Sequence, residues 1–150
     1  MKQTLFLERD GQVQSIETDH TVTVTEDPNG WADIVCSIRF RLEGEERIVT
    51  DQSTEDCIQK IENILPDGWH VHTCASCGHG HYCPYGNADN EIICVTDFQP
   101  KEQSDLWPLF ETEDFGHSRC RSLFHCCDSF TRPGPEEYWY NDFKYREDAD

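Results

Sequence analysis

The chain has 150 residues, 36% of them hydrophobic, so it is long and apolar enough to bury the core of a single domain. Its 12 basic and 30 acidic side chains give a formal net charge of −18. Such a surface repels nucleic-acid phosphates and anionic lipids and attracts cationic proteins, so we expect neither nucleic acid nor a membrane as partner. The charge has a second interpretation, which is solubility or a saline habitat.

The compartment follows from the absence of targeting signals and from the cysteine content. Residues 1–9 contain only a three-residue apolar run, unlike a secretory signal. No stretch approaches the roughly 18 apolar residues of a membrane helix. We therefore expect a cytoplasmic protein, in which nine cysteines are more typical of metal ligands than of disulfides.

The first half of the chain predicts an antiparallel sheet. Asp10-Gly11 is a hairpin turn signal, and Glu43-Gly44-Glu45 supports a second hairpin. Between them, side chains alternate between apolar and polar with the period of two that a strand requires. The expected strands are residues 4–8, 12–17, 21–25, 33–42 and 47–50.

One helix is predicted after the sheet. Ser53 can cap its first turn, and Asp56 stands three residues further on, as in a capping box. Cys57, Ile58, Ile61, Ile64 and Leu65 form an apolar stripe at helical spacing. Pro66 ends the helix, and a strand is expected at residues 69–73. We expect Cys57, like Cys36 in the preceding sheet, to serve packing.

After residue 73 glycine, histidine, cysteine and aromatic residues replace the periodic pattern. Such a stretch cannot easily fold on apolar burial alone, and a metal ion would supply the missing stabilisation. Cys74-x-x-Cys77 directly follows the expected strand and has the spacing of a zinc knuckle. A redox pair shares this spacing, but Gly78-His79-Gly80 after Cys77 is a poor start for the helix that such a pair prefers.

The spacing alone does not decide the other two metal ligands. Cys94 lies in an apolar strand, residues 92–96, that would return it toward the knuckle, although a packed core thiol is the alternative. Cys126 and Cys127 point in opposite directions in an extended segment, so one of them should suffice. The candidates for the two positions are His79, His81, Cys83, Cys94, His117, Cys120, His125, Cys126 and Cys127.

Several short motifs resemble a family of uncharacterised bacterial proteins. The family pattern runs approximately LPxG, CxxC, DYSPYGN, a single cysteine after a strand, and CPEFxxR. The matching residues here are 65–69, Cys74 and Cys77, 81–87, Ile93-Cys94, and Cys127 to Arg132. The resemblance implies that Cys74, Cys77, Cys94 and Cys127 are the repeated cysteines and that Cys126 replaces an apolar residue. This chain has His81 and Cys83 where the family usually has Asp and Ser.

Four cysteines would close the coordination shell of one metal ion and leave no position for a substrate, so we expect a structural zinc ion, with iron as the alternative metal. A metalloenzyme would instead use a His/Cys zinc site around His79, His81 and Cys83. A third hypothesis is a redox switch on the spare thiols Cys83, Cys120 and Cys126. Enzyme activity has no positive support in the sequence.

Two histidines and the C-terminal residues complete the expectations. His70 and His72 alternate along the strand at 69–73, and we expect them on a solvated face. Residues 136–145 mix aromatic and acidic side chains and predict an edge strand docked on the sheet. Residues 145–150 are expected to be frayed.

The sequence thus predicts an α+β fold with an antiparallel sheet, one principal helix and a zinc-ribbon-like C-terminal half. We expect a single domain, 1–150, made of a sheet-plus-helix part (1–73), a zinc-braced part (74–132) and an acidic aromatic segment (133–150). The functional hypothesis is a non-enzymatic module that binds a basic protein, and more specifically an immunity-type inhibitor of a partner such as a nuclease toxin. The oligomeric state is open.

Overall fold

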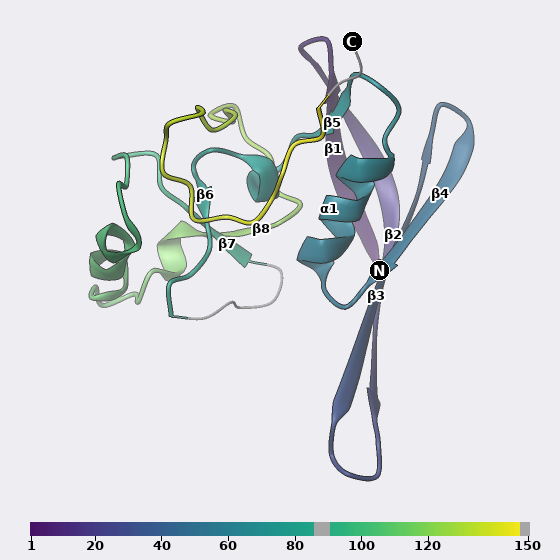
Figure 1. Cartoon of the computed structure of the whole chain (residues 1–150), viewed down its shortest axis with the longest axis horizontal. Coiled ribbons are helices and arrows are strands. Elements are labelled where there is room, and N and C mark those ends of the chain that lie inside the picture. The colour runs from purple at the N-terminus through teal and green to yellow at the C-terminus, as the bar shows by residue number, and fades with distance from the viewer. Residues whose placement is uncertain (86–90, 148–150) are drawn as a thin grey trace. The chain divides into compact units, whose positions relative to one another are not determined.

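A computed structural model describes residues 1–85 and 91–147, so Gly86 and Asn87 of the 81–87 motif lie outside the described residues. The chain forms two compact units (Figure 1). Unit 1 contains Met1–Val71 and the C-terminal residues from Tyr145, and unit 2 contains His72–Lys144. The mixed α+β class, with an antiparallel sheet and one main helix, is confirmed.

Unit 1 is built on a five-stranded antiparallel sheet with the order β4-β3-β2-β1-β5. The predicted hairpins at Asp10-Gly11 and Glu43-Gly44 are present, and at all four of these residues φ is positive. The apolar residues that alternate along the central strands, such as Leu7 and Ile38, are fully buried on one face. The strands are β1 (Lys2–Arg9), β2 (Gln12–Glu26), β3 (Ala32–Leu42), β4 (Glu45–Asp51) and β5 (Trp69–Val71).

Strands β2 and β3 are longer than the strands beside them. The segments expected at residues 12–17 and 21–25 are one continuous strand, β2. Its pairing with β1 ends at Asp19, and the pairing of β3 with β4 ends at Cys36. Beyond these points β2 and β3 pair only with each other, as far as Glu26 opposite Ala32. Figure 1 shows this two-stranded extension of the sheet.

The predicted helix is α1 (Thr54–Ile64). Its cap is confirmed, because the hydroxyl of Ser53 accepts a hydrogen bond from the amide of Asp56 at 3.1 Å. Cys57, Ile58 and Ile61 are fully buried between α1 and the sheet. Cys36 and Cys57 therefore pack in the core as expected, and burial raises the pKa of the Cys57 thiol to about 12.

The expectation of a solvated His70 is wrong. His70 is 3% exposed, and its Nδ1 lies 2.7 Å from a carboxylate oxygen of Glu62, which is itself fully buried. The amides of Val71 and Arg146 also donate to Glu62, at 2.9 and 3.0 Å. A carboxylate can be buried at this position because three donors replace the water that it loses.

The expectation of a frayed C-terminus is also wrong for the first residues of that segment. The Arg146 guanidinium donates to the carbonyl oxygens of Leu65 and Pro66, just after α1. The ring of Tyr145 packs edge-on against His70, with 5.9 Å between the ring centroids. The chain thus returns to unit 1 at its end; the last three expected residues, 148–150, lie outside the described part.

Unit 2 consists of short elements. Its three-stranded antiparallel sheet has the order β6-β7-β8, and a small apolar core of Ile93, Val95, Leu106 and Phe110 packs with Cys83 and Tyr140. Within the described residues, 136–145 form no strand, so the predicted edge strand is wrong. The elements are the 3₁₀ turns Cys74–Ser76 (η1), Gln103–Phe110 (η2) and His117–Arg119 (η3), and the strands β6 (Gly80–His81), β7 (Glu91–Cys94) and β8 (Cys120–Ser122).

In the described part of the chain, no helix has both the length and the apolar character needed to cross a membrane.

Candidate metal centre

The Cys74-x-x-Cys77 segment forms one tight turn. The Thr73 hydroxyl accepts a hydrogen bond from the amide of Ala75 at 3.2 Å, and the Ser76 hydroxyl accepts one from the amide of Thr73 at 3.2 Å. This reciprocal cap fixes a single 3₁₀ turn between the two cysteines. The His79 amide then donates to the Cys77 sulfur at 3.4 Å, the amide-to-sulfur contact expected of a knuckle.

Backbone hydrogen bonds join this turn to the segment that carries Cys127. The amide of Cys74 donates to the carbonyl of His125 at 2.7 Å, and the amide of Gly78 donates to that of Thr131 at 2.6 Å. Cys127 lies between these two attachment points in the chain. The turn and residues 125–131 are therefore held side by side, although about 50 residues of sequence separate them.

Strand pairing brings in Cys94. Gly80 of β6 stands opposite Cys94 of β7, and the amide of Val95 donates to the carbonyl of His79 at 2.9 Å. Gly80 also lies so close to the turn that a Cβ atom there would come within 2.3 Å of the Cys74 carbonyl oxygen. Only glycine permits this approach of β6 to the turn.

All four predicted cysteines line one cavity of about 10 Å³. That volume is roughly the space of one water-sized sphere, so it suits a single ion. Cys74 and Cys77 are buried, Cys94 is half-buried and Cys127 is exposed. The remaining lining residues are His79, Gly80, Ile92, Thr96 and Ser129.

The four thiols line the cavity, but as placed they do not form a complete coordination shell for a metal ion. Among residues 1–85 and 91–147, no group of three or more His, Cys, Asp or Glu side chains could hold a metal ion as placed. Burial, together with the neighbouring thiols, raises the pKa of Cys74 to about 12. Burial also raises the pKa of Cys94, against the opposing effect of the Arg121 and Arg119 cations. Metal binding would have to displace protons from these thiols and draw them together.

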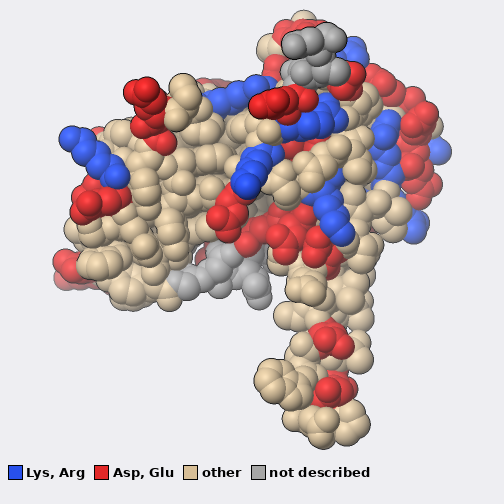
Figure 2. Space-filling view, in the orientation of Figure 1, with Lys and Arg blue, Asp and Glu red and all other residues tan. Residues whose placement is uncertain are grey.

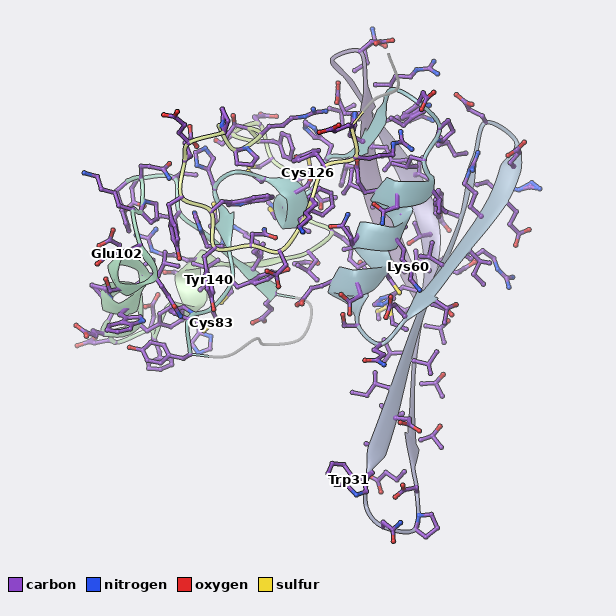
Figure 3. All side chains as sticks on the ribbon, viewed as in Figure 1. Trp31, Lys60, Cys83, Glu102, Cys126 and Tyr140 are labelled. Atoms are coloured by element: carbon purple, nitrogen blue, oxygen red, sulfur yellow. The ribbon has the colours of Figure 1, made fainter. Side chains whose placement is uncertain are left out.

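The other histidine and cysteine candidates lie mostly away from the cavity. Only His79 lines it. His81 is buried and its Nδ1 accepts a hydrogen bond from the amide of Tyr140 at 3.1 Å. Cys83 packs against the apolar core of unit 2 instead (Figure 3). The Nδ1 of His125 contacts the Cys74 sulfur at 3.3 Å, but His125 does not itself line the cavity.

Cys120 and Cys126 are half-buried and do not line the cavity. Burial raises the pKa of both thiols, the opposite of what a reactive thiolate requires. His117 lies on the surface at the start of η3. The structure thus brings together the four cysteines implied by the family resemblance and separates them from most of the other candidates.

Two residues that hold the turn escaped the sequence reasoning. The indole N–H of Trp139 donates to the carbonyls of Cys77 and Gly80, at 3.0 and 2.8 Å. The amide group of Asn141 donates to the carbonyls of Ala75 and Gly80, at 3.0 and 3.1 Å. The aromatic composition of residues 136–145 marked this segment as unusual, but no spacing rule connects it with the cysteines 60 residues earlier.

Comparison with known proteins adds no assignment: no family model, no curated protein and no solved structure matches this chain.

Proposed function

We propose that the chain is a non-enzymatic, acidic protein-binding module whose second unit is braced by one structural zinc ion. Cys74, Cys77, Cys94 and Cys127 would hold the ion, in a zinc-ribbon-like arrangement of the turn η1, strand β7 and the segment after β8. The observation that carries the proposal is that these four residues, from three separate parts of the chain, line one cavity of ion size.

The surroundings of the cavity favour a structural role over a catalytic one. Four thiolates with one Zn²⁺ carry a formal charge of about −2, which makes a weak Lewis acid with no open position for water. The alternative zinc site would use His81 and Cys83 together with His79. His81 accepts a hydrogen bond from the Tyr140 amide, and Cys83 packs against the apolar core of unit 2. Around the cavity, Trp139 and Asn141 fix backbone carbonyls, which supports a rigid scaffold.

Elemental analysis of purified variants tests the zinc site. We expect one zinc per chain in the wild type and its loss in Cys74→Ser, Cys94→Ser and Cys127→Ser. Cys126→Ser is the matched control, because Cys126 is the chain neighbour of Cys127 but does not line the cavity. Zinc should be retained in this control and in Cys83→Ser.

Other patterns of metal loss contradict the four-cysteine site in distinct ways. Loss in His79→Asn with retention in Cys127→Ser would show three cysteines and one histidine as ligands. Loss in Cys83→Ser with retention in Cys127→Ser would move the metal to the catalytic alternative. A wild-type chain without metal would remove the zinc proposal.

The negative net charge of the chain supports a basic protein as the partner. Acidic residues outnumber basic ones by 30 to 12, and both units carry them (Figure 2). A field of this sign accelerates association with cationic proteins and disfavours acidic ones. An immunity-type inhibitor that covers the basic active site of a nuclease toxin is the specific form of this hypothesis.

Affinity capture followed by titration of each purified partner tests the binding function. We expect captured partners to be basic proteins that bind one to one and lose affinity steeply with salt. For a nuclease partner, an equimolar amount of this chain should abolish cleavage of nucleic acid. Partners that are acidic, or affinities that do not change with salt, would contradict the proposal.

A further inference from the structure

Strands β2 and β3 form a two-stranded ribbon beyond the rest of the unit 1 sheet. We define the ribbon as residues 21–35. Within it the two strands pair from Thr23 opposite Val35 to Glu26 opposite Ala32, and no described residue of β1 or β4 pairs with residues 21–26 or 32–35. At about 3.3 Å per residue, this paired part is about 10 Å long. The turn at its end is fixed by Asp27, whose carboxylate accepts hydrogen bonds from the amides of Asn29 and Trp31.

The two faces of the ribbon differ in chemistry. Val22, Val24 and Ile34 share the face that continues the buried core of the sheet, yet they are 47%, 58% and 43% exposed. Trp31 at the end of the ribbon is 76% exposed, and Figure 3 shows its side chain there. The opposite face carries mainly threonines, with Val35 and Asp33. An apolar stripe of this kind on a solvent-exposed ribbon is typical of an interaction surface.

The ribbon also has an outer edge to which a further strand can be added. β4 ends at Asp51, and the chain then turns into α1, so residues 32–35 have no strand on that side among the described residues. An exposed edge of this kind is a template for pairing with an extended segment of another protein.

The charge of the ribbon selects the partner. It carries the carboxylates of Glu26, Asp27 and Asp33, and the chain has no Lys or Arg between Arg9 and Arg39. Figure 2 shows only acidic and uncharged residues on the visible face of the ribbon. A second copy of this chain would oppose three carboxylates with three more, which disfavours self-pairing, whereas Lys and Arg side chains would neutralise them.

We propose that this ribbon is the docking site for an extended, basic segment of a partner protein. The partner strand would pair with the ribbon edge and lay its apolar side chains beside Ile34 and Val24. Its Lys and Arg side chains would reach the carboxylates, and Trp31 would anchor the end of the contact. This inference rests on the proposed function, because it names the surface with which the module binds a basic protein.

Fluorescence anisotropy of a labelled peptide, with alternating lysine and valine over about a dozen residues, tests the ribbon in the full-length protein. We expect Trp31→Ser and Ile34→Thr each to weaken binding about tenfold or more. Val35→Thr is the matched control, since Val35 is 46% exposed, adjacent to Ile34 and on the opposite face. It should bind as the wild type does, and Asp33→Asn should weaken the salt-dependent part of the affinity.

The controls separate this inference from the proposed function. Poly-lysine, which lacks apolar side chains, should bind the wild type, Trp31→Ser and Ile34→Thr alike. If the wild type binds the alternating peptide but Trp31→Ser and Ile34→Thr bind it equally well, the ribbon is not the site and the basic-partner function stands. If neither cationic probe binds better than a peptide of alternating glutamate and valine, the basic-partner function itself fails. Self-association in sedimentation equilibrium that disappears in Trp31→Ser would instead show that a second copy occupies the ribbon.

Discussion

His81 illustrates how burial fixes the protonation state of a single residue. It is 1% exposed, and its Nδ1 accepts the hydrogen bond of the Tyr140 amide, so that nitrogen must carry no proton. Burial, and to a smaller extent the neighbouring His79, lower the pKa of His81 to about 4 from the usual 6.5. The folded state therefore excludes a proton that the unfolded state binds.

We predict from this that the stability of unit 2 falls in mildly acidic solution. The contribution of neutral His81 is complete above about pH 6.5 and is lost as the pH falls toward 4, by about 3 kcal/mol in total. Urea unfolding at a series of pH values measures the slope. His81→Asn keeps an acceptor near the position of Nδ1 but does not titrate, so its slope between pH 6.5 and 4 should be smaller than that of the wild type. Equal slopes in the two proteins would refute the assignment.

At the scale of elements, the end of the chain links α1 and β5. Glu62 lies on the buried side of α1, His70 lies in β5, and Arg146 belongs to the C-terminal segment. The Glu62 carboxylate accepts hydrogen bonds from both of these neighbours. The Arg146 side chain in turn donates to carbonyls that follow the last turn of α1, which α1 itself leaves unpaired.

We predict that Glu62→Gln lowers the free energy of unfolding of unit 1 by about 2 kcal/mol or more. The amide keeps the shape of the side chain but cannot accept from three donors, so one buried donor loses its partner. Hydrogen exchange of β1 and β5 amides measures the loss within unit 1. Asn63→Ala, at the exposed neighbouring position on α1, should change stability by no more than about 0.5 kcal/mol. Arg146→Ala should destabilise the same amides by about 1 kcal/mol, and normal exchange in both Glu62→Gln and Arg146→Ala would exclude the linkage.

At the scale of the whole molecule, the two units differ in the regularity of their secondary structure. Unit 1 has an extended sheet, a capped helix and a continuous buried face. Unit 2 has strands of only two to four residues, and several of its buried apolar side chains, such as Leu106, Leu123 and Phe143, lie outside the strands. Small units of this kind usually depend on metal ions or other cross-links.

We therefore predict that a zinc chelator affects the two units unequally. After chelation, amides in residues 72–144 should exchange at least about a hundredfold faster, while those of β1, β2 and β3 keep their protection. Hydrogen exchange with mass spectrometry resolves both regions in one experiment. Cys126→Ser should respond to the chelator as the wild type does, and equal loss of protection in both units would contradict a metal that braces only the second.

The sequence by itself determined what depends on neighbouring residues. Alternation predicted the strands of unit 1, and Ser53 with Asp56 predicted the start of α1, because side-chain period and capping are local properties of the chain. The cysteine spacing predicted a knuckle turn at Cys74, and the turn is present. The metal set itself stays a prediction, based on spacing and on the family resemblance.

Only the tertiary structure decided which faces are covered and which distant segments meet. Alternation placed His70 and Val24 on strand faces in the same way, yet His70 is buried against Glu62 and Val24 is exposed on the ribbon. The resemblance already implied Cys127 and not Cys126, but the position of Cys127 at the cavity and the contact of Trp139 with the turn depend on hydrogen bonds between segments 50 to 60 residues apart. A periodic pattern states which side chains share a face, but the neighbour that buries the face comes from elsewhere in the chain, and no local rule specifies it.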